Sequence, residues 1–189
     1  QTEKVWEFAD DLNLARIISV NKMDRDRADF FKVVTEVKEI FGDKATPVHL
    51  PIGAAEKFIG IIDLLAGKAY EFQADGSGRM KEIDIPDDVT ELVESQREQI
   101  VERIAESDDN LLERYLEGEE LTAKELLNGL RSGCVAGDIV PITCGSATKN
   151  MGSRLLLDLI VQCLPSPMDR GEREGVNPKD LVNPVYLKD

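Results

Sequence analysis

The order of apolar and polar positions near the start of the chain predicts a helix, a strand and a second helix. Residues 1–12 carry apolar side chains at helical spacing, residues 15–20 form a short apolar run, and residues 30–41 return to helical spacing before Gly42. This order is typical of α/β proteins, in which such a run is a buried strand of a parallel sheet. The polar stretch 21–27 then follows the carboxyl end of the strand, where open α/β sheets bind their ligands.

The pattern changes between residues 43 and 137. Short runs separated by Gly and Pro predict antiparallel strands of a small separate sheet, at residues 46–52, 58–62, 68–72 and 81–85. Three helices are predicted next: a long one that begins at Pro86, one from Asp109 to Glu117, and one that starts with a Thr122–Glu125 capping box and stops at Gly133. This middle stretch is therefore predicted to be an α+β unit.

The α/β pattern returns after residue 137. Residues 138–144 are predicted to form a second buried strand, and the loop 145–149 connects it to a helix that ends at the Leu-Pro-Ser-Pro stretch 164–167. Residues 168–189 contain charge, Gly and Asn-Pro with little periodicity, so they are predicted to be a linker towards a following domain. The second strand and loop repeat the arrangement of the first.

Length and composition indicate one or two soluble domains with a substantial core. Of 189 residues, 42% are hydrophobic and 32% charged, and no apolar run reaches the roughly 18 residues needed to cross a membrane. The net charge of −14 disfavours binding to a phosphate backbone, so no direct sequence-specific contact with nucleic acid is expected. Cys134, Cys144 and Cys163 accompany a single histidine, His49, so neither a disulfide framework nor a metal site is predicted. A reducing cytoplasm fits best.

The acidity is concentrated in the predicted helices of the middle stretch. Residues 86–120 contain thirteen acidic and three basic side chains, a net charge of −10. Two interpretations are open: a solvated helix face, or a docking surface for a basic protein.

The stretch Asn21-Lys-Met-Asp24 is the strongest candidate for ligand recognition. An ionised carboxylate offers only acceptors, so Asp24 can take two parallel N–H donors from one planar partner, as the ring N–H and exocyclic amino group of guanine provide. Adenine cannot present that pair. The Asn21 amide can hold the loop, and Lys22 can lay its methylene stem along the face of the base. The alternative is an ordinary polar turn after a strand.

The loop after the second predicted strand can complete the same site. Its side chains are small, so backbone N–H groups around Ser146, Ala147 and Thr148 can approach a ligand, and one of them can donate to the exocyclic oxygen of guanine. By itself this loop has little specificity. Together with the first loop it forms the candidate guanine site.

Further motifs occur in a fixed order over residues 1 to about 168. They are Gln1-Thr-Glu-Lys-Val-Trp6, Val20-Asn-Lys-Met-Asp-Arg25 with Ala28-Asp-Phe30, Gly60-Ile-Ile-Asp63, Lys68-Ala-Tyr70, Tyr115-Leu-Glu-Gly-Glu119, Cys144-Gly-Ser-Ala147, Lys149-Asn150, and Leu155-Leu-Leu-Asp158 with Leu164-Pro-Ser-Pro167. Taken together, this set resembles the translational GTPases, most closely those of the bacterial elongation factor G type and their paralogues. The joint occurrence is far more specific than either loop alone.

The resemblance implies an α/β fold with a P-loop-GTPase-like parallel sheet, of which the chain holds only the carboxyl half, and a small inserted α+β subdomain. Residues 1–42 and 138–167 would belong to the GTP-binding domain, residues 43–137 to the insert, and residues 168–189 to the linker. GTP and GDP are the implied ligands, and promotion of ribosomal translocation is the implied function. In this family the insert contacts the ribosomal stalk, which would give the acidic helices a partner.

The chain departs from the family pattern in what it lacks. The phosphate-binding G-x-x-x-x-G-K-[ST] loop, the magnesium-binding switch threonine and the D-x-x-G stretch are absent. No catalytic residue is therefore predicted here, and Mg²⁺ is expected only with an upstream half. The missing initiating Met likewise suggests a piece of a longer protein. Asp26-Arg27 and Thr148 differ from residues common in the closest relatives, which leaves the paralogue open.

Three functions remain open on the sequence. The first is the guanine-selecting part of a ribosome-dependent elongation GTPase, and the second is a release or ribosome-protection factor of the same superfamily. The third is a non-catalytic acidic binding module. The chain by itself is expected not to hydrolyse GTP, to bind guanine nucleotides weakly, and to expose an apolar sheet edge at residues 17–20.

Overall fold

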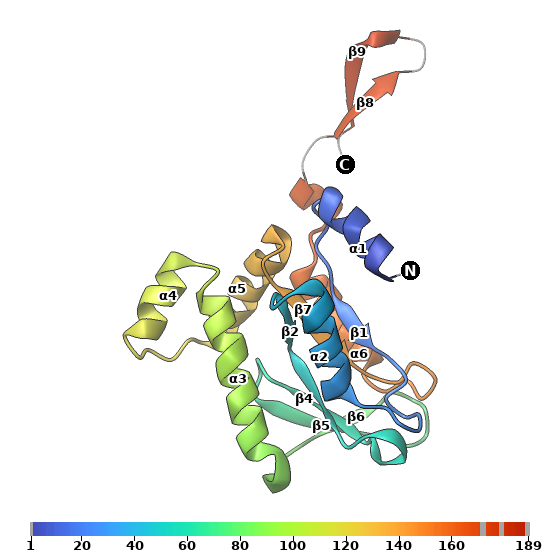
Figure 1. The fold of residues 1–189 in the computed structure, drawn as a ribbon, viewed down its shortest axis with the longest axis vertical. Coiled ribbons are helices and arrows are strands. Elements are labelled where there is room, and N and C mark those ends of the chain that lie inside the picture. The colour runs from blue at the N-terminus through green and yellow to red at the C-terminus, as the bar shows by residue number, and fades with distance from the viewer. Residues whose placement is uncertain (1, 171–172, 178–179, 188–189) are drawn as a thin grey trace.

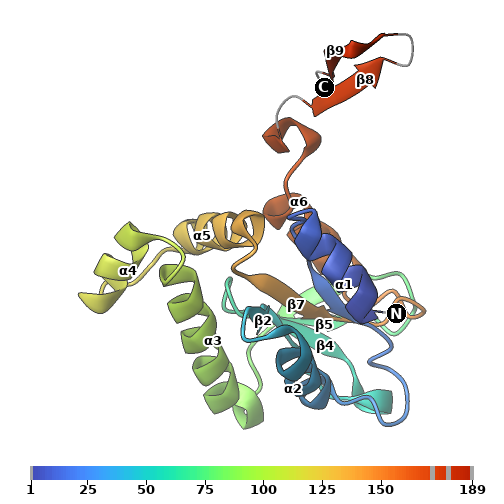
Figure 2. The ribbon, with the colours of Figure 1, turned by 45° about the horizontal axis from the view of Figure 1, so that its top comes forward.

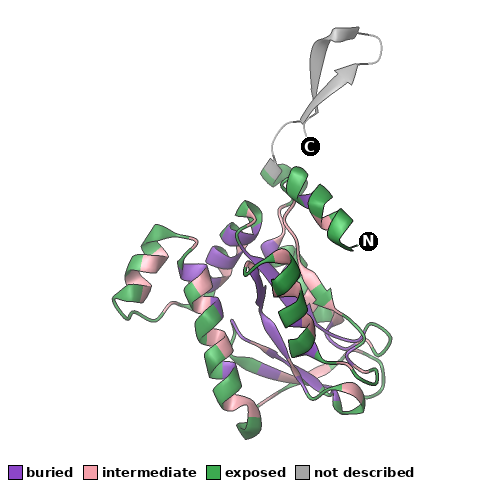
Figure 3. Ribbon diagram, viewed as in Figure 1, coloured by how far each residue is buried: buried purple, intermediate pink, exposed green. Residues whose placement is uncertain are grey.

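The computed structural model describes residues 2–170, 173–177 and 180–187. A parallel sheet of three strands has the order β1 (Ile18–Val20), β7 (Val140–Cys144), β2 (Ala45–Pro47). The central strand β7 is buried along its whole length and is one of the purple strands at the centre of the molecule in Figure 3. Because Val20 pairs with Cys144, the loops after β1 and β7 leave the sheet side by side.

Three helices pack around this sheet: α1 (Thr2–Asp11), α2 (Phe30–Phe41) and α6 (Ser153–Cys163) (Figures 1 and 2). Asp29 caps α2 by accepting a hydrogen bond from the Lys32 N–H at 3.0 Å. Helix α1 is less well covered, because Ala9 is the buried residue among its described positions. Trp6 of this helix stacks on Phe41 of α2, with ring centroids 4.1 Å apart.

An antiparallel sheet of four strands, in the order β3-β4-β5-β6, lies beside the parallel sheet. Its strands are β3 (His49–Ile52), β4 (Gly60–Asp63), β5 (Lys68–Phe72) and β6 (Met80–Ile83), and a 3₁₀ helix (Ala55–Lys57) separates the first two. Val48 joins the two sheets, because its N–H donates to Ile142 O at 2.9 Å and its carbonyl accepts from Leu64 N at 3.0 Å. The buried apolar residues of both sheets accordingly form one core.

Helices α3 (Thr90–Ala105), α4 (Asp109–Leu116) and α5 (Ala123–Ala136) follow the antiparallel sheet, and α4 lies far from the parallel sheet in Figure 1. The predicted capping box of α5 is confirmed. The Glu125 N–H donates to Thr122 Oγ1 at 3.3 Å, and the Thr122 N–H donates to Glu125 Oε2 at 2.8 Å. Helix α5 packs against α3, α6 and β7, so it connects the middle stretch to the parallel sheet.

Two predictions for the middle stretch are wrong in detail. Residues 46–52 are not one strand of the antiparallel sheet, because β2 pairs with β7 in parallel register and the chain crosses between sheets at Val48. The third helix does not stop at Gly133 but continues to Gly137, which adopts a left-handed conformation at φ +82°. Gly133 lies inside the helix, where a Cβ would be 2.6 Å from Ile139 Cδ1. The lack of a side chain at this position therefore permits close packing against Ile139.

Two further predictions need correction. The helix predicted from Pro86 starts as a 3₁₀ turn at Asp87–Val89, and the α-helix begins at Thr90. Residues 168–189 are not an irregular linker throughout, because a 3₁₀ helix (Pro167–Arg170) is followed by an antiparallel hairpin of β8 (Arg173–Asn177) and β9 (Asp180–Leu187). A two-stranded ladder can form by main-chain pairing alone, so the sequence need not show an apolar periodicity there.

Candidate guanine-base site

The two predicted ligand loops meet at the carboxyl end of the parallel sheet. The Gly145 N–H donates to Val20 O at 3.0 Å, and the Met23 N–H donates to Gly145 O at 3.1 Å. Each loop is thus fixed to the end of the neighbouring strand. Met23 is buried below the loops and fills the core there.

Asn21 bridges the two loops through its side chain. Its Oδ1 accepts hydrogen bonds from the Lys22 N–H at 2.7 Å and from the Ala147 N–H at 3.0 Å. Lys22 has φ +65°, a left-handed conformation that non-glycine residues seldom adopt, and its side chain is exposed. Backbone conformations of this kind concentrate at binding sites, where surrounding bonds hold them.

Asp24 lies half-buried between the loops. Its pKa is lowered from the ordinary value, chiefly because the Ser146 hydroxyl lies beside the carboxylate and favours its charged form, so the group is ionised at neutral pH. The Oδ1 atom is enclosed, yet it has no hydrogen-bond partner among the described residues. A buried acceptor without a donor is unfavourable, so a donor from a ligand would satisfy it.

The loop after β7 presents backbone amides beside this carboxylate. Ser146 is buried, and its main chain pairs with Met151 through two hydrogen bonds of 2.9 Å. Ala147 and Thr148 are exposed. The Ala147 N–H is bonded to Asn21, whereas the Thr148 N–H has no partner in the described part of the chain, and Thr148 Oγ1 lies 3.3 Å from Ser146 Oγ. The structure therefore brings all six predicted site residues together, among them an enclosed carboxylate oxygen and a main-chain N–H that have no partner in the described part of the chain.

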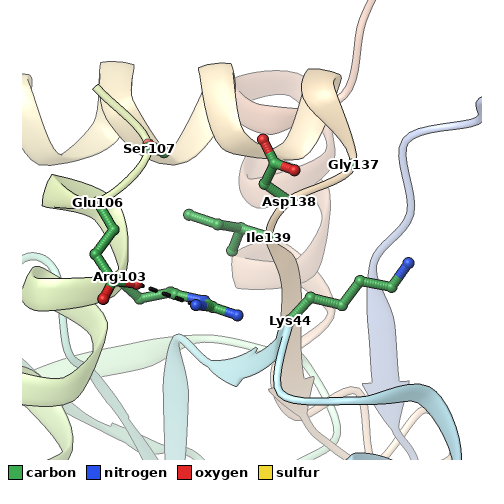
Figure 4. A pocket seen from close by; sticks show the side chains of 7 residues that line it. All are labelled: Lys44, Arg103, Glu106, Ser107, Gly137, Asp138 and Ile139. Atoms are coloured by element: carbon green, nitrogen blue, oxygen red, sulfur yellow. Dashed lines mark hydrogen bonds and ion pairs between the residues drawn. The ribbon is translucent and has the colours of Figure 1, made fainter. Parts of the chain in front are cut away.

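A cavity of about 460 Å³ lies at the opposite, amino end of the parallel strands (Figure 4). It is lined by Lys44, Arg103, Glu106, Ser107, Gly137, Asp138 and Ile139. Arg103 pairs with Glu106 at 3.0 Å and Lys44 Nζ lies 3.4 Å from Asp10 Oδ1, so both cations already face carboxylates. This cavity is separate from the candidate guanine-base site.

His49 is a core residue. It is 4% exposed, and its Nδ1 lies 2.6 Å from Thr143 Oγ1 on the buried strand β7. Among the residues that the structure describes, no group of three or more His, Cys, Asp or Glu side chains is placed to hold a metal ion. None of the described helices is long and apolar enough to cross a membrane.

A parallel sheet that carries these two loops at the carboxyl ends of adjacent strands defines a nucleotide-binding fold of the P-loop-GTPase-like class, with an antiparallel sheet beside it. The model of the elongation factor Tu GTP-binding domain family matches residues 1–166, and the chain belongs to this family. Members of this family are GTP-binding domains of elongation factors.

A solved crystal structure of a protein from Thermus thermophilus is similar to this chain. The two share 32% sequence identity and superpose with a TM-score of 0.81, over 94% of this chain and 27% of that protein. The predicted mixed α/β fold class is thereby confirmed. The chain therefore spans only about a quarter of the length of that protein.

Sequence reasoning missed one group of residues beside the site. The turn between β5 and β6 touches Asn150, which directly follows the loop that carries Ala147 and Thr148. Asn150 and its partner Gly76 are 74 residues apart in sequence, so no local pattern could have connected them.

Proposed function

We propose that this chain is the guanine-reading part of the GTP-binding domain of a ribosome-dependent elongation GTPase of the elongation factor G type, which promotes translocation in the cytoplasm. The observation that carries the proposal is the enclosed Oδ1 of the ionised Asp24, which has no partner among the described residues, beside an exposed amide donor at Thr148. Guanine presents the complementary set, with two N–H groups on one edge and a carbonyl oxygen next to them.

The base is selected by this chain, and the phosphates and Mg²⁺ are held by residues outside it. Exposed apolar side chains support this view, at Val5 (64%) and Phe8 (54%) on α1, at Leu12 (66%) directly after it, and at Leu157 (61%) and Val161 (78%) on α6. Strand β1 forms an edge of the parallel sheet and lies next to these helices. Parallel sheets are normally covered on both faces, so a further part of the same domain would pack here. Transfer of the terminal phosphate to water would depend on groups in that part.

We assign residues 1–42 and 138–167 to the GTP-binding domain and residues 43–137 to the insert, with strand β2 of the insert extending the parallel sheet. Residues 168–189 lead towards a following domain. The acidic helices of the insert are assigned to a basic protein surface of the ribosome, in the stalk region. The net charge of −10 over residues 86–120 supports such a partner.

The substitution Asp24→Asn tests base recognition in the longer protein to which we assign this chain. An amide offers one donor and one acceptor, so GTP should lose a charge-assisted paired contact and bind about 2 to 4 kcal/mol more weakly. Xanthosine triphosphate should bind more tightly, because its extra carbonyl can accept a hydrogen bond from the new amide N–H. Nucleotide titrations of both proteins measure the two affinities.

Asp26→Asn is the matched control, since Asp26 is an exposed carboxylate of the same loop and the charge change is identical. It should leave both affinities unchanged. Equal GTP affinity of the Asp24→Asn variant and the unaltered protein would remove Asp24 from the base site and overturn the proposal.

A further inference from the structure

The turn between β5 and β6 lies directly against the loop that follows β7. Figures 1 and 2 both show the two loops side by side, although they come from distant parts of the chain. Asn150 Nδ2 donates to Gly76 O at 3.5 Å. A Cβ on Gly78 would lie 2.6 Å from Asn150 Nδ2 and 3.0 Å from Asn150 O, so the turn fits against Asn150 without spare room.

The turn is held rigid by its own polar contacts. Asp75 accepts from the Ser77 N–H at 2.9 Å and pairs with Arg79 Nη2 at 2.7 Å, and Ser77 Oγ accepts from Arg79 Nε at 3.1 Å. The Ser77 and Arg79 donors lower the pKa of Asp75, with Ser77 the larger cause, so its charge persists at neutral pH. A turn fixed in this way can act as a support for the loop it touches.

Asn150 controls the shape of the loop that presents the amides. It adopts φ +53°, and its N–H donates to Ala147 O at 3.3 Å, which closes the four-residue turn from Ala147 to Asn150. The Ser146–Met151 pair fixes the base of the same turn. A displacement of Asn150 is therefore expected to move the Thr148 amide, whereas Asp24 follows β1 and is not part of this turn.

We propose that Gly78 and Asn150 are positioning residues for guanine recognition: the β5–β6 turn of the insert holds the 147–150 loop where the Thr148 amide meets the exocyclic oxygen of the base. This inference rests on the proposed function and extends it, because it makes the contact to the exocyclic oxygen of guanine depend on the position of the insert. By linkage, a nucleotide that engages the loop also favours the arrangement of the insert that supports it.

The test compares glycine substitutions at two positions of the same turn, in the longer protein to which we assign this chain. Gly78 and Gly76 have φ +73° and +71°, so alanine meets similar backbone strain at both, but a Cβ at Gly76 has no atom within 4 Å. Gly78→Ala pushes on Asn150 and Gly76→Ala does not. Asn150→Gly is the second variant, because it tolerates the left-handed conformation and removes the side-chain bond to the turn.

Two nucleotides distinguish a displaced 147–150 loop from a general loss of nucleotide binding. GDP carries the exocyclic oxygen and the ring N–H, whereas 2-aminopurine riboside diphosphate lacks both and keeps the exocyclic amino group, from which Asp24 can still accept a hydrogen bond. Gly78→Ala and Asn150→Gly should each weaken GDP about fivefold, the loss expected for one hydrogen bond, and leave the 2-aminopurine nucleotide unchanged. Gly76→Ala should change neither affinity. Fluorescence titration measures both nucleotides.

Two results would overturn the inference while leaving the proposed function intact. One is an equal loss of GDP affinity in Gly78→Ala and Gly76→Ala, and the other is an equal loss for both nucleotides in Gly78→Ala and Asn150→Gly. An unaltered protein that binds GDP no better than the 2-aminopurine nucleotide would overturn the proposed function as well, because no base contact would then exist to position.

Discussion

At the scale of single residues, His49 connects the packing of the two sheets to pH. Its ring is buried between β3 and β7, with Nδ1 2.6 Å from Thr143 Oγ1 and Nε2 4.0 Å from Asp63 Oδ2. Burial lowers the pKa of His49 from its ordinary 6.5, and the Asp63 charge opposes this shift without reversing it. The folded protein therefore keeps this imidazole neutral under conditions in which an unfolded chain would protonate it.

The expected consequence is a loss of stability as the pH falls below about 6.5, the ordinary pKa of histidine. The unfolded state then binds a proton that the folded state excludes, so the free energy of unfolding should decrease by up to about 1.4 kcal/mol per pH unit. Urea unfolding between pH 7.5 and 5.5 measures this slope, in a range above the titration of ordinary carboxylates. His49→Gln can keep a hydrogen bond to Thr143 and should flatten the slope. An unchanged slope in that variant would assign the effect to another group.

The meeting of the two candidate loops was predictable, because each loop directly follows an apolar strand of the same parallel sheet. Asp24 is the first carboxylate after the apolar strand, and a carboxylate can accept two parallel donors. The bond from the Ala147 N–H to Asn21 and the contact between Gly78 and Asn150 were not predictable, because both join residues far apart in sequence. Such contacts depend on how the strands pair, and strand pairing cannot be predicted from local patterns in a single sequence.

At the scale of elements, helix α3 separates an inward and an outward face. Val93, Ile100 and Ile104 are buried in the core. Arg97 also turns inward, where its guanidinium donates to the carbonyls of Leu64 and Leu65. Because the Arg97 guanidinium is bonded to main-chain carbonyls, this side chain does not neutralise the negative charge of the acidic residues on the outer face.

Reversing the charge of this outer face should slow association with the ribosome. Glu91, Glu94 and Glu98 are predicted to lie on one stripe of α3, so replacing all three by lysine removes the attraction to a basic surface. The association rate at low salt should fall by about tenfold and lose most of its salt dependence, while nucleotide affinity stays constant. Stopped-flow mixing with ribosomes measures the rate in the longer protein.

The matched control replaces Glu3, Glu7 and Asp11, which are exposed along α1, by lysine. The charge change is the same, but the position is remote from the acidic helices. If both triple variants slow association equally, the rate responds to net charge alone. If neither variant slows association, the acidic face of α3 is only solvated and does not contact the ribosome.

Whole helices were predictable where their apolar residues recur at helical spacing or where a capping motif marks their start. Helices α2 and α6 were predictable from apolar spacing, and the start of α5 from its capping box. Gly133 misled the prediction of the end of α5, because this glycine, like Gly129, permits close packing against neighbouring side chains rather than a turn. No local pattern indicates this role, since the atoms that exclude a Cβ belong to residues outside α5, among them Ile104 and Ile139.

At the scale of the whole molecule, the parallel sheet has an edge with apolar surroundings. Strand β1 has one neighbour, β7, among the described strands, and its residues Ile18 and Val20 are partly exposed. Phe8 on α1 is 54% exposed, and Leu12, directly after this helix, is 66% exposed. Exposed strand edges pair readily with other chains, and contiguous apolar surface promotes association.

The 189-residue chain alone is therefore expected to self-associate, or to bind a separately supplied upstream segment, and not to hydrolyse GTP. GDP should bind more weakly than micromolar, because in GTPases of this type the phosphates and their magnesium ion provide much of the affinity through a backbone cradle and a lysine. Only the base contacts of Asp24 and the loop after β7 remain here. Calorimetry with GDP and Mg²⁺, combined with size-exclusion chromatography, tests both parts. Phe8→Glu should reduce the association without changing GDP binding, whereas micromolar or tighter GDP binding by a monomer would reveal a phosphate site within these residues.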